Sequence, residues 1–91
     1  MAIVTFKAKI TGKVQGVFFR AYTKEQAVLL GVKGYANNLA DGSVEVLAQG
    51  SAESVASLLE WLWTGSPHSQ VHSVTTSDIA TDEFYRHFTT G

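Results

Sequence analysis

The sequence contains no cysteine, so disulfide bonds, thiolate zinc sites and cysteine nucleophiles are all excluded. No apolar run approaches the roughly 18 residues that a membrane span needs. The segment Met1–Ile10 alternates apolar and polar residues and lacks the unbroken apolar stretch of a signal peptide. We therefore expect a cytoplasmic protein that does not act on a membrane.

A broad excess of charge is also missing. The formal net charge is −1 at pH 7, which provides no general attraction for nucleic acid. Any anion that the protein binds must therefore be held locally. Internal repeats, linkers and low-complexity segments are absent as well. A chain of 91 residues with 45% hydrophobic content is predicted to form a single domain over residues 1–91, acting as a monomer.

What is present is periodicity. Apolar side chains alternate with polar ones near the N-terminus, at Val4, Phe6, Ala8 and Ile10, which is the period of a strand with one buried face. A helix is predicted over Phe19–Leu30, and Gly31 suits its C-terminal end. Its expected apolar side consists of Phe18, Tyr22 and Leu29. The opposite side carries Arg20 and Lys24.

The next segment, Val32–Gly50, predicts a hairpin that turns at Asp41-Gly42. Ser51 can cap a second helix, with Glu53 in its first turn. The apolar positions of that helix follow helical spacing at Val55, Leu58, Leu59 and Leu62. The motif "GSP" is expected to end the helix, and Trp61 and Trp63 are expected to pack beside its apolar stripe. Two weaker strands are predicted at Val71–Thr76 and Phe84–Phe88.

The resulting order is β-α-β-β-α-β with a short final strand. This order predicts an α+β, ferredoxin-like sandwich: a mostly antiparallel sheet of four to five strands with two helices on one face. The first two strands should run parallel through a right-handed crossover, so that their C-terminal ends lie at the same edge. We therefore expect the segment Gly12–Arg20 to lie near Asn37, Asn38 and Leu39.

The stretch Gln15–Arg20 could bind an anion. Gly16 relaxes the steric limits on the backbone, so that successive N–H groups could converge, and a helix N-terminus follows directly. Arg20 adds a permanently charged, planar guanidinium that can hold two phosphate oxygens. Taken alone, these residues favour an ordinary strand-to-helix turn over an anion site, and their spacing is not that of a Walker A loop.

Other polar residues offer less. Because strand alternation places Asn37 and Asn38 on opposite faces, only one of them can point at the loop. A carboxamide there could orient water, although it is too weak a base to deprotonate it. The histidines are scattered and have no carboxylate at ligand spacing, so no metal site is predicted at His68, His72 or His87.

Two segments resemble the signature segments of the acylphosphatases: "GKVQGVFFR" (Gly12–Arg20) and "GYANNLADGSVEVLAQG" (Gly34–Gly50). Together with "GSPHSQV" after the second helix, the resemblance covers nearly the whole chain. It implies hydrolysis of a small acyl phosphate to a carboxylate and inorganic phosphate by direct attack of water, without metal or cofactor. Two residues depart from the usual family pattern, Asn37 and Leu39, and this leaves the substrate preference open.

The resemblance also implies roles for particular residues. Arg20 and Asn38 would be catalytic: Arg20 would bind the phosphate and Asn38 would orient the attacking water. The phosphate would also be bound by the loop amides of Gln15, Gly16, Val17, Phe18 and Phe19. A carboxylate leaves readily without protonation, which explains why the candidate site has no evident acid or base.

Three other readings stay open at this stage. The same loop could hold an anion without turning it over, as a binding module. RNA-recognition domains share this strand order, but the segment "SVEVLAQG" lacks their exposed aromatic and basic residues. A domain that handles carbamoyl phosphate also resembles this sequence, although such domains normally belong to much larger chains that contain cysteine.

Overall fold

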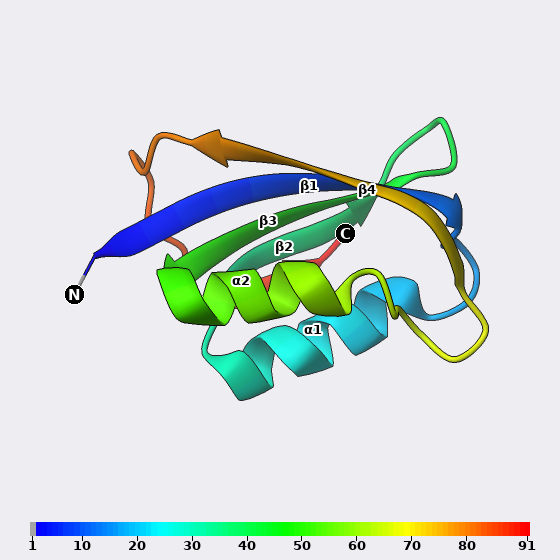
Figure 1. The fold of residues 1–91 in the computed structure, drawn as a ribbon, viewed down its shortest axis with the longest axis horizontal. Helices are drawn as coiled ribbons and strands as arrows, with labels where there is room; N and C mark the ends of the chain where they lie inside the picture. Colours follow the sequence, from blue (N-terminus) through cyan, green and yellow to red (C-terminus); the bar gives the residue numbers. More distant parts are fainter. Residues whose placement is uncertain (1) are drawn as a thin grey trace.

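The computed structural model describes residues 2–91. Two helices cover one face of a five-stranded sheet whose strand order is β4-β1-β3-β2-β5 (Figure 1). The elements are β1 (Ile3–Lys13), α1 (Phe19–Leu30), β2 (Lys33–Asn38), β3 (Val44–Ser51), α2 (Ala52–Trp61), β4 (Gln70–Ile79) and β5 (Phe88–Thr90). The β2–β5 pair is parallel and the other three pairs are antiparallel. The fold is therefore the expected ferredoxin-like βαββαβ sandwich, with β5 as an additional edge strand.

Strand β1 lies inside the sheet and leads directly into the segment of interest. Its predicted buried face is confirmed: Ala8 and Ile10 are fully buried beneath the helices. Near its end the pairing with β4 shifts register between Thr11 and Gly12. A Cβ on Gly12 would lie 2.2 Å from the carbonyl oxygen of Gln70, so this glycine is required by the close approach of β4.

The bounds predicted for α1 are confirmed, and Gly31 ends the helix in the left-handed conformation, with a φ of 73°. The predicted apolar face is wrong, because its three members are exposed: Phe18, Tyr22 and Leu29.

The buried face of α1 instead consists of Phe19, Thr23 and Ala27, at i, i+4 and i+8. The sequence pattern did not predict this face because Thr23, with its polar hydroxyl, is one of its members. In the structure the Thr23 hydroxyl donates to the carbonyl oxygen of Phe19 at 2.8 Å, which satisfies it inside the core.

The hairpin and the second helix form as predicted. Strands β2 and β3 pair across the Asp41-Gly42 turn, and Val44 and Val46 are fully buried. Ser51 caps α2 by accepting a hydrogen bond from the N–H of Ser54 at 3.2 Å. The apolar stripe of α2 faces the sheet through Val55, Leu58 and Leu62, while Leu59 is partly buried against the core. The prediction for Trp63 is wrong, since its side chain is 55% exposed.

The last part of the chain differs most from the prediction. Val71–Thr76 lies within β4, but Phe84–Phe88 is not a strand, because β5 begins only at Phe88. The chain must cross from the β4 edge of the sheet to the β5 edge, and it does so over the face that the helices leave open. There Gln49 donates to the carbonyl oxygen of Glu83 at 2.7 Å and accepts from the N–H of Tyr85 at 2.9 Å.

Within residues 2–91 no helix is long and apolar enough to cross a membrane.

Candidate active site

The segment between β1 and α1 is a short loop, Val14–Phe18. Gly16 has a φ of 76°, a conformation that L side chains rarely adopt, yet apart from Gly16 and its two chain neighbours no residue has an atom within 4 Å of where its Cβ would be. The glycine is therefore needed for the path of the backbone and not for packing. Phe18 has a φ of 60°, the one positive φ of a non-glycine residue in the part of the chain that the structure describes.

The two helices begin differently. The N-terminus of α2 has the Ser51 cap and a carboxylate, Glu53, in its first turn. The N-terminus of α1 has neither a side-chain cap nor an acidic residue in its first turn. In addition, no backbone N–H from Gln15 to Phe18 donates to an acceptor among residues 2–91. The positive end of α1 is thus left without a partner of its own.

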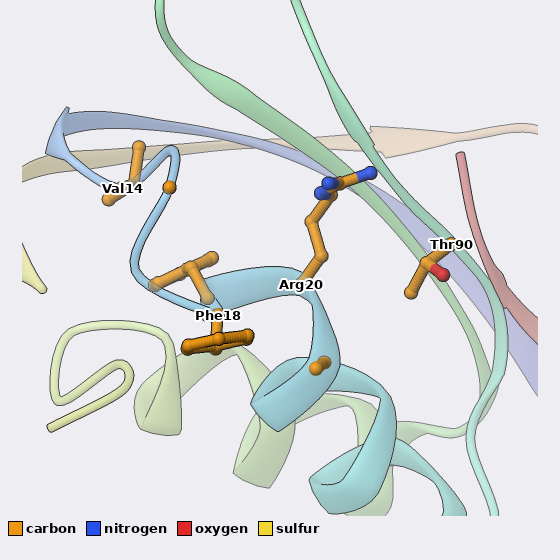
Figure 2. Close-up of a pocket in the computed structure, with 7 residues that line it drawn as sticks. Val14, Phe18, Arg20 and Thr90 are labelled. Carbon is orange, nitrogen blue, oxygen red and sulfur yellow. The ribbon is translucent and has the colours of Figure 1, made fainter. Parts of the chain in front are cut away.

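A cavity of about 400 Å³ opens at this helix end. Its lining residues come from the loop, the first turn of α1 and β5: Val14, Gly16, Phe18, Phe19, Arg20, Ala21 and Thr90. In Figure 2 the Arg20 side chain extends from the start of α1, with its guanidinium between the loop and Thr90. Uncommitted amides, the helix N-terminus and a permanent cation therefore meet at one cavity, which is the arrangement that an anion requires.

Arg20 has one polar contact among the described residues. Its guanidinium donates to the main-chain oxygen of Gly91, which follows β5. No side-chain carboxylate lies within ion-pair distance of it in residues 2–91. Arg20 as a whole is only half-buried and its guanidinium has this one contact among residues 2–91, so most of its donors remain available to a ligand.

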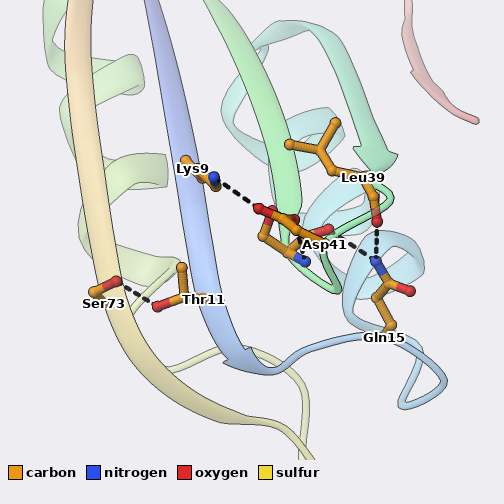
Figure 3. A network of polar contacts seen from close by, with 7 residues as sticks. Lys9, Thr11, Gln15, Leu39, Asp41 and Ser73 are labelled. Atoms are coloured by element: carbon orange, nitrogen blue, oxygen red, sulfur yellow. Dashed lines mark hydrogen bonds and ion pairs between the residues drawn. The ribbon is translucent and has the colours of Figure 1, made fainter.

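The loop is held to the neighbouring hairpin by Gln15. Its side-chain amide donates to the carbonyl oxygens of Leu39 and Ser43, at 2.8 and 2.9 Å (Figure 3). This confirms the expectation that the first loop lies beside the end of β2. The family resemblance implied a role only for the main-chain amide of Gln15, so the hydrogen bonds of its side chain were not predicted.

Two further supports of the loop were also missed. The hydroxyl of Ser66 is buried and donates to the carbonyl oxygen of Val17 at 2.7 Å. Phe19 is buried against Trp61, with ring centroids 6.2 Å apart. Ser66 belongs to the "GSP" motif after α2, from which only the end of the helix was predicted.

The β2–β3 hairpin is also held by a side chain of the neighbouring strand β1. Lys9 forms an ion pair with Asp41 at 2.8 Å, and Asp41 also accepts from the N–H of Ser43 at 3.0 Å. These contacts, first the hydrogen bond from Lys9 and then those from Ser43, hold the pKa of the Asp41 carboxyl well below its usual range. Because Ser43 also accepts from Gln15, the Asp41 contacts stabilise the hairpin turn to which the loop is tied.

Asn38 is the last residue of β2 and is exposed. It pairs with Val44, whose side chain lies in the core beneath the helices, so strand alternation places Asn38 on the face where α1 begins. Asn37 pairs with Glu45 and belongs to the opposite face. Asn38 is not among the residues that line the cavity. The structure thus brings Arg20 and the loop together at the cavity, and places Asn38 at the adjoining strand end.

In the described part of the chain, no group of three or more histidine and carboxylate side chains could hold a metal ion. The three histidines are exposed and separate: His68, His72 and His87.

The fold and the site define a class of protein: a ferredoxin-like α+β domain whose first loop and first helix surround a cavity with free amides and an arginine. A family model described as acylphosphatase matches residues 6–90. An acylphosphatase of Shewanella amazonensis is 49% identical over 80 residues, covering 88% of this chain and 88% of that protein. One of Xanthomonas campestris is 59% identical over 70 residues, covering 77% and 80%.

Solved structures agree. The structure of an acylphosphatase from Coxiella burnetii matches with a TM-score of 0.93 and 37% identity, covering 98% of this chain and 93% of that one. The chain belongs to the acylphosphatase family. Its activity is the hydrolysis of acyl phosphates, which confirms the function inferred from the two signature segments.

Proposed function

We propose that the cavity at the start of α1 holds the phosphoryl group of the substrate, and that Arg20 and Asn38 are the catalytic residues. The single observation that carries this proposal is the contrast between the two helices. Only α1 begins without a cap or a carboxylate, and it does so beside a half-buried arginine. The amides of Gln15, Gly16, Val17, Phe18 and Phe19 then bind phosphate oxygens together with the Arg20 guanidinium.

The chemistry needs little more than position and charge. The oxygen of a water molecule, oriented by the Asn38 carboxamide, bonds to phosphorus while the bond from phosphorus to the acyl oxygen breaks. The electron pair of that bond leaves with the carboxylate, which is stable without protonation. Both protons of the water end on the phosphate, so inorganic phosphate is the second product. Arg20 and the loop amides stabilise the charge that spreads over the phosphoryl oxygens.

The site of attack can be tested by isotope labelling. Benzoyl phosphate hydrolysed in ¹⁸O-enriched water should yield labelled phosphate and unlabelled benzoate, because water attacks phosphorus in this mechanism. Label in the benzoate would show attack at the acyl carbon and would overturn the roles given to Arg20 and Asn38. Binding of phosphate without any loss of the anhydride would instead support a binding module.

We also propose the setting in which the enzyme works. Residues 1–91 act as one domain and as a monomer in the cytoplasm, without nucleic-acid or membrane partners. The low net charge and the cysteine-free composition support this setting. Light scattering coupled to size exclusion would test the monomer, and a dimer at micromolar concentration would refute it.

A further inference from the structure

The peptide group that joins Val17 to Phe18 is held from one side by a distant side chain, that of Ser66. Ser66 is 2% exposed, and its hydroxyl donates to the carbonyl oxygen of Val17 at 2.7 Å. Among residues 2–91 this carbonyl oxygen has no other hydrogen-bond donor. The orientation of one peptide plane in the loop before α1 therefore depends on a hydroxyl that lies beyond α2 in the chain.

The turn that carries Ser66 is itself fixed in place. The N–H and the hydroxyl of Ser69 both donate to the main-chain oxygen of Ser66, at 3.0 and 2.7 Å. Gly65 has a φ of 68°, and a Cβ at this position would lie 3.0 Å from the ring of Phe19. The turn thus packs directly against the first residue of α1, which keeps Ser66 close to the loop.

The contact from Ser66 also determines where the next N–H points. A peptide group is planar and trans, so its carbonyl and its N–H point in opposite directions. Because the Val17 carbonyl points toward Ser66, the N–H of Phe18 points away from it. Gly16 and Phe18 line the cavity at Arg20, whereas Val17 and Ser66 do not. The Phe18 N–H has no acceptor among the described residues, so it is available to a ligand.

The opposite orientation of this peptide would relieve local strain. Phe18 has a φ of 60°, a left-handed conformation in which the Cβ of an L residue crowds the following carbonyl oxygen. Turning the Val17–Phe18 peptide over would rotate this φ by about half a turn, back into the favourable negative range. It would also present the Val17 carbonyl oxygen, in place of the Phe18 N–H, to a bound phosphate, which would repel it. The hydrogen bond from Ser66 opposes that change.

We propose that Ser66 is a positioning residue for the hydrolysis: it holds the Val17–Phe18 peptide in the orientation in which the Phe18 N–H binds a phosphoryl oxygen. The inference rests on the proposed function, since that function places the phosphoryl group at this loop. Ser66 does not touch the substrate and acts only through the main chain of the loop.

Ser66→Ala and Thr23→Val form a matched pair of variants. Each removes a buried hydroxyl that donates to a main-chain oxygen and leaves the size of the side chain nearly unchanged. The oxygen that Thr23 contacts, that of Phe19, also accepts a hydrogen bond within α1, so its peptide stays in place without the hydroxyl. Urea denaturation would show whether the two variants lose similar stability.

The two variants should differ in activity. Ser66→Ala should lower kcat for benzoyl phosphate by about 10- to 100-fold and weaken inhibition by inorganic phosphate. This loss is smaller than the roughly 10²- to 10³-fold effect of removing a transition-state donor outright, because the peptide can still reach the productive orientation. Thr23→Val should leave kcat and phosphate inhibition nearly unchanged.

The amide signal of Phe18 reports the orientation directly. We would titrate ¹⁵N-labelled wild type and both variants with inorganic phosphate and follow the amides of Phe18 and Gly16 by NMR. In the wild type and Thr23→Val, phosphate should move the Phe18 amide proton to lower field. In Ser66→Ala that shift at saturation should be much smaller, while the Gly16 amide still responds.

The outcomes separate this role from the proposed function. An unchanged kcat and Phe18 shift in Ser66→Ala would overturn the positioning role alone. Equal losses of kcat in Ser66→Ala and Thr23→Val would overturn it too, because the effect would then follow stability and not orientation. If phosphate shifted no loop amide in the wild type, the phosphate site of the proposed function would fail as well.

Discussion

Arg20 is the residue on which the mechanism depends most. Arg20→Gln keeps a polar side chain but removes the charge and the planar fork. We expect turnover to fall by roughly 10³-fold, comparable to arginines in other phosphoryl transfers, and inhibition by inorganic phosphate to weaken. Arg20→Lys should recover only a small part of the activity, because an ammonium group cannot hold two oxygens in the same plane. Steady-state kinetics measure both effects, and circular dichroism checks the fold. A folded Arg20→Gln protein with near-normal turnover would remove Arg20 from the site.

Asn38 and Asn37 form a natural pair of test and control. Asn38→Ala should leave phosphate affinity nearly unchanged and reduce turnover by about two orders of magnitude, because only a contact that positions the water is lost. Asn37→Ala should have a much smaller effect, since its register with Glu45 places it on the other face of the sheet. Turnover and product inhibition by phosphate are the measurements. The reverse ranking of the two variants would assign the water to Asn37.

Phe18 and Phe19 test which face of α1 is buried. The sequence pattern predicted the side that contains Phe18, whereas the structure buries the side that contains Phe19. Phe19 is 1% exposed, and its truncation to alanine should lower the free energy of unfolding by about 3–5 kcal/mol. Phe18 is 74% exposed, so Phe18→Ala should change stability by no more than about 0.5 kcal/mol. Urea denaturation of both variants measures the difference. Equal losses would mean that Phe18 packs against the core as well.

At the scale of elements, the β2–β3 hairpin should make stability depend on pH. The pKa of Asp41 is lowered in the folded protein, so its stabilising effect is present above the unfolded pKa of about 3.9 and is lost as the pH falls through the lower, folded value. Asp41→Asn removes this contribution. The wild type should therefore be more stable than the variant near neutral pH, and the difference should shrink below about pH 4.

Denaturation curves between pH 3 and pH 7 measure that convergence. Lys9→Gln removes the principal cause of the lowered pKa and should reduce the same pH dependence in part. A constant difference between Asp41→Asn and the wild type at every pH would contradict the electrostatic explanation.

Elements also show where sequence patterns are reliable. The ends of α1, the Asp41-Gly42 turn and the cap of α2 depend on neighbouring residues, and all three were predicted correctly. The buried face of α1 depends on what the helix packs against. On that face the polar residue Thr23 is buried, because its hydroxyl donates a hydrogen bond to a carbonyl oxygen of its own helix. A pattern of apolar residues does not predict such a position.

For the whole molecule, we predict hydrolysis without a metal ion. The proposed leaving group is a carboxylate and needs no Lewis acid, and within residues 2–91 no side-chain cluster is suited to hold a cation. Activity on benzoyl phosphate should be unchanged after exhaustive treatment with a chelator. A loss of activity that one divalent metal specifically restores would contradict the mechanism.

The site itself was predictable only in part. The sequence indicated Arg20 and the loop amides because a glycine-containing loop followed by an arginine at the start of a helix is a local pattern. The resemblance to the acylphosphatase signature segment made the assignment of this pattern to a phosphate site specific. Their joint place at one cavity is seen in the structure, whereas their roles, and that of Asn38, remain predictions. The supports of the loop, Gln15 and Ser66, were not predicted. Each contacts a segment more than twenty residues away, and a hydrogen bond across that separation leaves no periodic trace.

The sequence by itself thus determined the order of the elements, the ends of α1, the cap of α2, the family and the identity of the candidate catalytic residues, because alternation, caps, turns and signature segments are properties of neighbouring residues. Only the tertiary structure decided which face of α1 is buried and where the final strand begins. It alone showed the cavity lined by Lys24, Lys33 and His87, which come from α1, from β2 and from the segment just before β5. The physical reason is the same in each case: burial and charge density depend on which segments meet in space, and that is set by packing around the sheet.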